Sequence, residues 1–201
     1  MLKLYDSRLS GNAHKVRLLL SNLGIPFERR TFVLPEGRHK TPEFLAKNPL
    51  GRIPVLELED GRTIFESNAI LTYLAEGTEM LPSDRFDRAQ VMEWLFFEQF
   101  DLVRNLALPR FWIGVARQRE KIADKLPEMH EAGNKAFAIM DRHLDSRHFF
   151  VADQYTIADI SLFGYTSVAH DGEYDMSRYP NVLAWLDRVK AQPGYVPLVQ
   201  D

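Results

Sequence analysis

The sequence predicts two domains of different class: a mixed α/β domain over residues 1–76 and an all-helical domain over residues 84–201, joined by a linker at 77–83. Short β-type runs and frequent Pro and Gly residues lie before Gly77, whereas strand signals nearly vanish after Ser83 in favour of long helical patterns. The 201 residues, 45% of them hydrophobic, are enough for one sizeable core or two modest ones.

The first helix of the α/β domain is predicted over Gly11–Leu23. Val16, Leu19 and Leu20 recur at spacings of three and four residues, which gives one apolar stripe along a helix. Gly24 follows the stripe and is typical of a helix end. Strands on either side of this helix would pair in parallel, because a βαβ crossover joins them.

A hairpin and a second helix complete the first domain. Asp60-Gly61 is a turn signal between two β-type runs, and a helix begins at Ser67 and ends at Gly77. The hairpin adds antiparallel strands, so the predicted order is β-α-β, a short helix, then β-β-α. The predicted strands are Leu2–Tyr5, Phe27–Phe32, Val55–Leu58 and Thr63–Phe65.

The second domain contains only helical patterns. Ser83–Ala116 is very long for one helix, and Pro109 lies inside it, which predicts a kink or break near Leu108. A further helix is predicted over Leu126–Leu144. Two more helices are predicted after it, each from the residues at its N-terminus.

The last two helices are indicated by capping residues. Thr156 precedes a helical pattern with Asp159 at its third position, which predicts a capping box and a structural role for Asp159. Pro180 is typical of a first helical turn, and the helix that it begins ends before Pro193.

Charge and composition exclude several classes of function. The net charge is −3 with acidic and basic residues interspersed, so nucleic acid and anionic membranes are not expected partners. No apolar run reaches the length of a membrane span, and we expect a cytoplasmic protein. Cysteine is absent, which excludes disulfides and a sulfur nucleophile of the protein's own. His143 and His148 have poor spacing for metal ligands, so no metal is expected.

Ser10-Gly11-Asn12 admits two interpretations. Ser10 is a suitable N-cap for the first helix, which is a purely structural role. Alternatively, the small residues leave the helix terminus open, so that its amides, the Ser10 hydroxyl and the Asn12 amide face an external anion. The spacing alone leaves both open.

Two further stretches have the same ambiguity. Pro54 lies at the start of a strand, where it cannot donate to the ladder and suggests a turn. Glu66-Ser67 lies at a strand-to-helix junction, where Ser67 is either a simple cap or part of a clamp for an amino-acid head group. In the clamp, the Ser67 hydroxyl and helix amides hold a carboxylate while Glu66 accepts an ammonium.

The order of four motifs resembles the glutathione S-transferase family, and a bacterial-like branch of it. The motifs are "SGNAHKVRLLL", "PEFLAKNPLGRIPVL", "IFESNAILTYLAE" and "FVADQYTIADISLFGY", and together they cover nearly the whole chain. The resemblance implies a thioredoxin-like N-terminal domain, a helical C-terminal domain that lines the electrophile site, a homodimer, a detoxification role and glutathione as co-substrate.

The resemblance also implies roles for individual residues. Pro54 corresponds to the family's cis-proline, which leaves the Ile53 main chain to pair with the cysteinyl part of glutathione, and Glu66 and Ser67 correspond to the γ-glutamyl clamp. Ser10 and Asn12 are the candidate donors to the glutathione sulfur. A free thiol has a pKa of about 8.5, so a hydrogen-bond donor and a helix N-terminus that favour the thiolate would lower the pKa of the glutathione thiol. Which of the two is the main donor stays open.

Other residues have weaker candidate roles. Tyr5 is a rival hydroxyl, although its position in the first strand favours packing. The loop residues His39, Lys40 and Arg52 are candidates for binding the glycine carboxylate, with solvated side chains as the alternative. Phe111 and Trp112 fall on a helical stripe that could bind the electrophile or belong to the core.

The sequence therefore predicts a transferase that activates the glutathione thiol for attack on a small hydrophobic electrophile. Glutathione-dependent peroxidase, isomerase or dehalogenase activity would use the same first domain. A non-enzymatic interaction module with the same architecture is a further alternative, because fold does not fix function.

Overall fold

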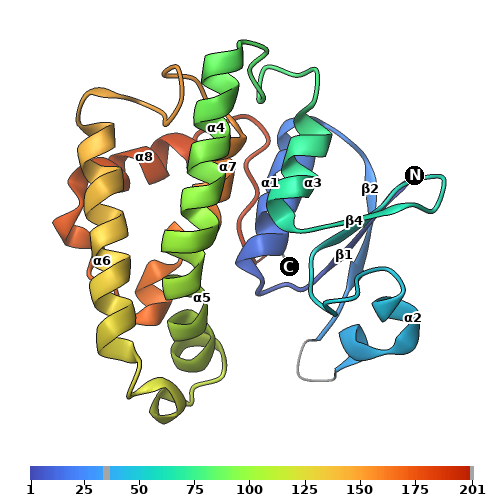
Figure 1. Cartoon of the computed structure of the whole chain (residues 1–201), viewed down its shortest axis with the longest axis horizontal. Coiled ribbons are helices and arrows are strands. Elements are labelled where there is room, and N and C mark those ends of the chain that lie inside the picture. Colours follow the sequence, from blue (N-terminus) through green and yellow to red (C-terminus); the bar gives the residue numbers. More distant parts are fainter. Residues whose placement is uncertain (34–36, 200–201) are drawn as a thin grey trace. The chain divides into compact units, whose positions relative to one another are not determined.

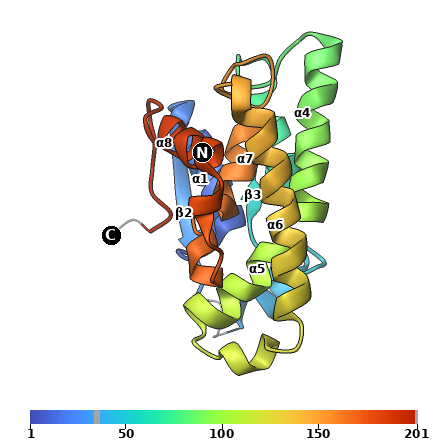
Figure 2. The ribbon, with the colours of Figure 1, turned by 90° about the vertical axis from the view of Figure 1, so that its left-hand side faces the viewer.

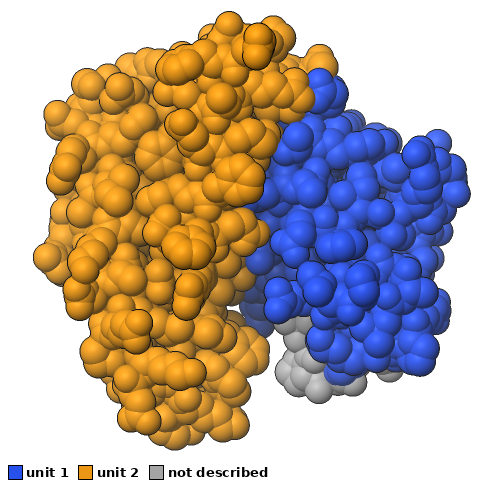
Figure 3. All heavy atoms as spheres, in the orientation of Figure 1, with its two compact units in different colours: residues 1–76, 192–201 blue, residues 77–191 orange. Residues whose placement is uncertain are grey.

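The computed structural model describes residues 1–33 and 37–199, and the chain divides into two compact units. Unit 1 comprises Met1–Glu76 together with the C-terminal segment from Gln192, and unit 2 comprises Gly77–Ala191. Figures 1 and 3 show the course of the chain and the two units. As predicted, the first unit contains a small mixed sheet with helices and the second is helical.

In the described part of unit 1, the four strands form one sheet in the order β2-β1-β3-β4. β1 pairs with β2 in parallel and with β3 antiparallel, and β3 pairs with β4 antiparallel, as predicted from the crossover and the hairpin. The strands are β1 (Leu2–Asp6), β2 (Phe27–Thr31), β3 (Val55–Glu57) and β4 (Thr63–Phe65).

The helices of unit 1 lie on opposite faces of this sheet. α1 (Gly11–Asn22) packs on α3 (Ser67–Ala75), as Figure 1 shows. Asp6 of β1 is bonded by an arginine of α1, whereas the ring of Tyr5, which alternates with Asp6, packs on Phe44 of the short helix α2 (Pro42–Leu45).

Unit 2 begins with a continuous helical run whose geometry changes along its length. α4 (Arg85–Phe97) leads into a π-helical stretch at Glu98–Val103, then α5 (Arg104–Arg110) and a second π-helical stretch at Phe111–Val115. Of the predicted kink or break near Leu108, the break is wrong: Pro109 lies inside α5, and the helical geometry changes only at Phe111. Figure 2 shows α5 beside α6 (Leu126–His143), with which it is in contact.

A side chain from elsewhere in unit 2 explains why Pro109 is tolerated. Proline has no N–H, so the carbonyl of Asn105 one turn earlier loses its helical donor. The Tyr174 hydroxyl lies 2.9 Å from that oxygen and 3.0 Å from the Met129 oxygen. Tyr174 thus satisfies a main-chain acceptor in the interior of the unit.

The remaining helices form the core of unit 2 around Asp159. α7 (Ile157–Thr166) is buried along its length and begins with the predicted capping box between Thr156 and Asp159. The Asp159 carboxylate also accepts from the indole of Trp185 in α8 (Pro180–Lys190) at 2.9 Å, and burial raises its pKa to about 6. Asp159 therefore has the structural position that the sequence predicts.

Five 3₁₀ turns complete the described secondary structure, and no helix in the described part of the chain has the length and apolar character needed to cross a membrane. The 3₁₀ turns are Arg38–Lys40, Arg119–Ile122, Leu144–Ser146, Ala169–Gly172 and Met176–Arg178.

The C-terminal segment belongs to unit 1, which corrects the prediction that it is part of the helical domain. The Pro193, Val196 and Leu198 carbonyls accept hydrogen bonds from Asn22, His14 and Arg17 of α1. His14 and Arg17, polar side chains of α1, are buried where this segment packs, and the loop-like composition of the segment does not predict the contact.

Candidate functional site

The sheet register brings the predicted site segments to one end of the sheet. Tyr5 of β1 pairs with Val55 of β3, and Val55 pairs with Phe65 of β4. The chain beyond β1 leads to Ser10, the chain before β3 contains Ile53–Pro54, and the chain after β4 is Glu66–Ser67. Residues that are far apart in the sequence therefore meet at this end.

Three polar side chains from α1 and α3 form a chain of contacts, which we call the Ser67 cluster: Asn12, Lys15 and Ser67. The Ser67 hydroxyl donates to Asn12 Oδ1 at 3.3 Å and accepts from Lys15 Nζ at 3.5 Å. Ser67 is 2% exposed and Lys15 is fully buried, whereas Asn12 is partly exposed. The cluster thus places a cation, a hydroxyl and an amide between two helix N-termini.

Ser10 caps α1, and this role leaves its proton unused. Its Oγ accepts from the Ala13 N–H at 3.2 Å, which uses a lone pair of the hydroxyl oxygen. A serine hydroxyl also has one O–H to donate. The cap and a donor to a bound sulfur use different parts of the hydroxyl, so the two interpretations of Ser10 do not exclude each other.

The Ile53–Pro54 peptide bond is cis. Pro54 is buried directly before β3, and Ile53 is partly exposed. Among the residues that the structure describes, none forms a hydrogen bond with the Ile53 main chain. The Ile53 N–H and C=O are therefore open to a ligand.

Glu66 and Ser67 do not form the simple cap that one interpretation predicts. Glu66 is the N-cap residue of α3 with φ +68°, a backbone conformation that is rare outside glycine, and its side chain makes no capping bond. Such strained residues cluster at ligand sites. Ser67 is already the first helical residue, and its hydroxyl bonds to Asn12 rather than to the helix end.

The three loop candidates for a carboxylate differ in their surroundings. Lys40 already has a main-chain partner, because its Nζ donates to the Gly51 oxygen at 2.7 Å. His39 is partly buried, its Nδ1 has no partner in the described structure, and burial followed by the charge of Lys40 lowers its pKa. Arg52 is exposed.

Phe111 and Trp112 lie in the second π-helical stretch of unit 2. Their rings pack edge to face with centroids 5.0 Å apart, and Lys121 lies over the Trp112 ring. Phe111 is 36% exposed and Trp112 is partly exposed. They are not core residues, and they present aromatic surface on unit 2.

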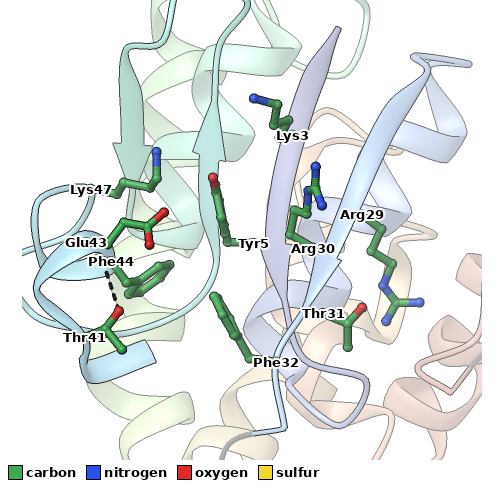
Figure 4. Close-up of a pocket in the computed structure, with 10 residues that line it drawn as sticks. All are labelled: Lys3, Tyr5, Arg29, Arg30, Thr31, Phe32, Thr41, Glu43, Phe44 and Lys47. Carbon is green, nitrogen blue, oxygen red and sulfur yellow. Dashed lines mark hydrogen bonds between the residues drawn. The ribbon is translucent and has the colours of Figure 1, made fainter. Parts of the chain in front are cut away.

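The opposite face of the sheet carries a hollow of about 640 Å³, shown in Figure 4. Tyr5, Phe32 and Phe44 form its aromatic floor, and none of the predicted site residues lines it. The other lining residues are Lys3, Arg29, Arg30, Thr31, Thr41, Glu43 and Lys47.

Beside this hollow lies a second polar group, the Glu57 cluster: Lys3, Tyr5, Lys47 and Glu57. The Glu57 carboxylate accepts from Lys3 at 2.8 Å, Lys47 at 2.6 Å and the Tyr5 hydroxyl at 2.8 Å. These hydrogen bonds, from Lys3 and then Lys47, lower the pKa of Glu57 to about 2. The Tyr5 hydroxyl is thus bound to Glu57, on the face away from Asn12 and Ser67.

Among the described residues, no group of three or more His, Asp or Glu side chains could hold a metal ion. The His143 ring packs on Phe150 and donates from Nε2 to the Phe150 oxygen at 2.9 Å, and His148 pairs with Asp153 on the surface. The two histidines have separate partners.

Comparison with known proteins identifies the family. Residues 9–76 match the family model of the glutathione S-transferase N-terminal domain, and residues 115–188 match that of the C-terminal domain. The chain belongs to the glutathione S-transferase family. It is 32% identical over 211 residues to glutathione S-transferase 3 of Zea mays, with 96% of this chain and 91% of that protein covered.

Solved glutathione S-transferase structures share the fold. That of a Pseudomonas fluorescens glutathione S-transferase is 42% identical with a TM-score of 0.96, and 99% of each chain is covered. The structure of a glutathione transferase of Burkholderia graminis is 27% identical with a TM-score of 0.84, and the match covers 96% of this chain and 85% of that one. That structure has two glutathione molecules bound per subunit.

The relatives of this chain also include a protein that is not named a glutathione S-transferase. Elongation factor 1-gamma of Prunus avium is 29% identical over all of this chain, which spans 48% of that protein. Membership of the family therefore leaves open whether a given chain is a transferase.

Sequence reasoning missed Lys15. It lies within "NAHKVRL", where a lysine three residues after Asn12 reads as an ordinary helix-surface residue. Asn12 and Lys15 share a face of α1, and α3 covers that face. The helical spacing relative to Asn12 was the available signal, and it has meaning only once α3 is known to pack there.

Proposed function

We propose that the chain is a glutathione S-transferase that binds glutathione on unit 1, holds its thiol as the thiolate and directs it at a small hydrophobic electrophile. The thiolate attacks the electrophilic carbon and forms a thioether, and the leaving group departs with its electron pair. Because the protein has no cysteine, the reacting sulfur belongs to glutathione. Ser10 and Asn12 are the proposed donors to that sulfur.

The contact between Asn12 and Ser67 supports this proposal most strongly. It joins the proposed thiolate donor to the proposed γ-glutamyl clamp at 3.3 Å, at the end of the sheet where Ile53 precedes β3. One extended tripeptide could therefore reach both. The α1 N-terminus and the Asn12 NH₂ group favour an anion, which lowers the pKa of a thiol.

The remaining groups of unit 1 fit the rest of the tripeptide. The first N–H groups of α3 and the Ser67 hydroxyl suit the γ-glutamyl carboxylate, and the exposed Glu66 carboxylate suits its ammonium. The open main chain of Ile53 would pair with the cysteinyl residue. His39 and Arg52 remain candidates for the glycine carboxylate, and Lys40, which bonds Gly51, would support their loop.

The electrophile would bind through apolar contacts. Phe111 and Trp112 present aromatic surface on unit 2, and we expect F111A and W112A to raise the KM for the electrophile rather than for glutathione. Peroxidase, isomerase and dehalogenase reactions would begin from the same thiolate. An assay panel of these substrate classes separates them.

A non-enzymatic interaction module is the second candidate, and the likeness to elongation factor 1-gamma favours it. The test is retention on immobilised glutathione followed by conjugation of a chlorodinitrobenzene. We expect retention and conjugation by the parent chain. Retention without turnover of any electrophile supports the module, and failure to bind glutathione overturns the transferase.

A homodimer in the cytoplasm that acts in detoxification completes the proposal. Phe96 and Phe100, one helical turn apart, are 72% and 68% exposed, as expected of a surface that a second copy covers. Light scattering should give twice the mass of the chain, and F96E with F100E should yield monomers.

A further inference from the structure

Asn48 is a buried asparagine in the loop between α2 and β3, and it has no role in the function proposed so far. Its side chain is 2% exposed. Its Nδ2 donates to the Arg52 oxygen at 2.8 Å, and its Oδ1 accepts from the Leu50 N–H at 3.0 Å. The amide thus bonds main-chain groups on either side of Gly51, in the loop that leads to Ile53.

These two hydrogen bonds require both ends of a carboxamide. One main-chain group is a donor and the other is an acceptor, so the side-chain oxygen faces the Leu50 N–H and the NH₂ group faces the Arg52 oxygen. Aspartate has the same shape but would place a carboxylate oxygen against the Arg52 oxygen, and alanine would remove both bonds. Loss of a buried main-chain partner costs free energy, so Asn48 fixes the conformation of this loop.

The Arg52 oxygen belongs to the same peptide group as the Ile53 N–H. In a trans peptide group, which is planar, the C=O and the N–H point in opposite directions. Within the described chain, the cis bond is the following one, Ile53–Pro54, so the Arg52–Ile53 bond is trans. Because Asn48 holds the Arg52 oxygen, the Ile53 N–H points away from the buried amide. It is one of the two main-chain groups of Ile53 that no described residue engages.

The preceding peptide group is held as well. The Gly51 oxygen accepts from Lys40 Nζ at 2.7 Å. Gly51 has φ +54°, and a Cβ at this position would lie 3.0 Å from Leu45 Cδ2 and 3.1 Å from the His39 oxygen. The loop is therefore fixed by contacts within unit 1, and its last main-chain donor is oriented before a ligand arrives.

We propose that Asn48 is a positioning residue that directs the Ile53 N–H at the cysteinyl carbonyl of glutathione. This inference rests on the proposed function, because it assumes that the cysteinyl residue pairs with the Ile53 main chain. The pairing fixes the cysteinyl residue, and hence its sulfur, relative to the donors Ser10 and Asn12. Asn48 itself does not touch the ligand.

The test compares the Kd of glutathione with that of an analogue in which a trans-alkene replaces the amide between cysteine and glycine. The analogue keeps the shape and both carboxylates but has no carbonyl to accept from Ile53. The parent chain should bind it roughly 5- to 10-fold more weakly than glutathione, as expected for one hydrogen bond. Asn48→Ala and Asn48→Asp should bind glutathione roughly 5- to 10-fold more weakly than the parent chain, and should bind the two ligands with Kd values within about twofold.

Asn22→Ala is the matched control. Asn22 also uses its side-chain amide to hold the main chain of a distant segment, because its Nδ2 donates to the Pro193 oxygen at 2.6 Å. It lies at the C-terminal end of α1, whereas Ser10 caps the other end. We expect Asn22→Ala to keep the parent Kd for glutathione and the parent ratio between the two ligands. A merely structural role of Asn48 would likewise leave that ratio unchanged.

The outcomes that overturn the inference differ from failure of the proposed function. If Asn48→Ala binds glutathione as the parent chain does, or weakens both ligands by the same factor, Asn48 does not position Ile53. If neither Asn48 variant folds, the parent chain still decides: Kd values within about twofold for the two ligands contradict a bond from the Ile53 N–H to the cysteinyl carbonyl. If the parent chain binds neither ligand, the proposed function itself is wrong.

Discussion

The Ser67 cluster and the Glu57 cluster lie on opposite faces of one small sheet and contain similar groups. Each has a hydroxyl and at least one lysine. In the Glu57 cluster, the lysines and the hydroxyl converge on a carboxylate that the protein supplies. In the Ser67 cluster, the hydrogen bonds lead to the partly exposed Asn12, beside an Ile53 main chain that no described residue engages.

This difference is the one we expect between a structural polar cluster and a binding site. Hydrogen bonds that end on a carboxylate of the chain stabilise the fold, whereas hydrogen bonds that end at a partly exposed amide can be redirected to a ligand. Substitutions in the Glu57 cluster should therefore change stability and leave glutathione binding intact. Substitutions in the Ser67 cluster should do the opposite.

The largest effect is expected for Ser67→Ala. Loss of the hydroxyl removes a charge-assisted hydrogen bond to the carboxylate, which is worth about 1.5 to 3 kcal/mol, so the Kd for glutathione should rise by roughly 10- to 150-fold. Isothermal titration calorimetry measures this Kd for Ser67→Ala and for the parent chain. Unfolding in urea should show a change below about 1.5 kcal/mol. A variant that binds normally would remove Ser67 from the site.

Glu57→Gln should produce the complementary result. It replaces a carboxylate that accepts from two lysines and a hydroxyl by a neutral amide with one acceptor oxygen, so the free energy of unfolding at pH 7 should fall by about 1 to 3 kcal/mol while the Kd for glutathione stays the same. The folded-state pKa is about 2 and the ordinary value is 4.5. The stabilisation is therefore present above pH 4.5 and is lost as the pH falls toward 2.

The pH dependence provides the check on this prediction. Parent chain and Glu57→Gln, unfolded in urea at a series of pH values, should differ most near neutrality and converge in acid. A difference that persists at pH 2.5 would mean that the loss arises from packing rather than from the charge.

Two substitutions of Ser10 separate its role as the N-cap of α1 from its proposed role as a donor to the sulfur. Serine to alanine at an N-cap costs about 1 kcal/mol, whereas serine to glycine costs only a few tenths. Ser10→Ala and Ser10→Gly should therefore differ in stability. If the hydroxyl also donates to the sulfur, both variants should lose the same several-fold factor in kcat/KM with glutathione; if Ser10 is only a cap, Ser10→Gly should retain the parent rate.

The smallest effect is expected for Tyr5→Phe. The ring keeps its contacts with Phe32 and Phe44, and Glu57 keeps both lysines, so stability should change by about 1 kcal/mol or less. Conjugation rate and thiol pKa should not change. A large loss of activity would restore Tyr5 as the rival hydroxyl.

Local patterns were sufficient to predict the sheet, the first two helices and the capping box at Asp159, because each depends on spacing and capping within a short stretch. Local patterns were not sufficient where a contact with a residue distant in the sequence determines the local structure. Pro109 predicted a kink or break, but the helix is unbroken there, and the Tyr174 hydroxyl supplies the missing donor to the Asn105 oxygen. The C-terminal segment looked like the end of the helical domain, but α1 binds it.

The candidate site was accessible from sequence mainly through the resemblance. Glu66-Ser67 suggested a clamp from residue chemistry alone, whereas Ile53 and Asn12 acquired roles only from the family motifs. Lys15 could not be found, because its meaning depends on the packing of α3 over α1. The positive φ of Glu66 likewise results from the junction rather than from any property of glutamate.

The proposed function requires that unit 1 hold the sulfur of glutathione as an anion. The most direct measurement is the ultraviolet titration of the thiolate in the complex, for the parent chain and Asn12→Ala. We expect a thiol pKa of about 6.5 in the parent complex, against about 8.5 for a free thiol, and a pKa closer to that of the free thiol in Asn12→Ala. A bound thiol that titrates as it does in water, in both proteins, would contradict it.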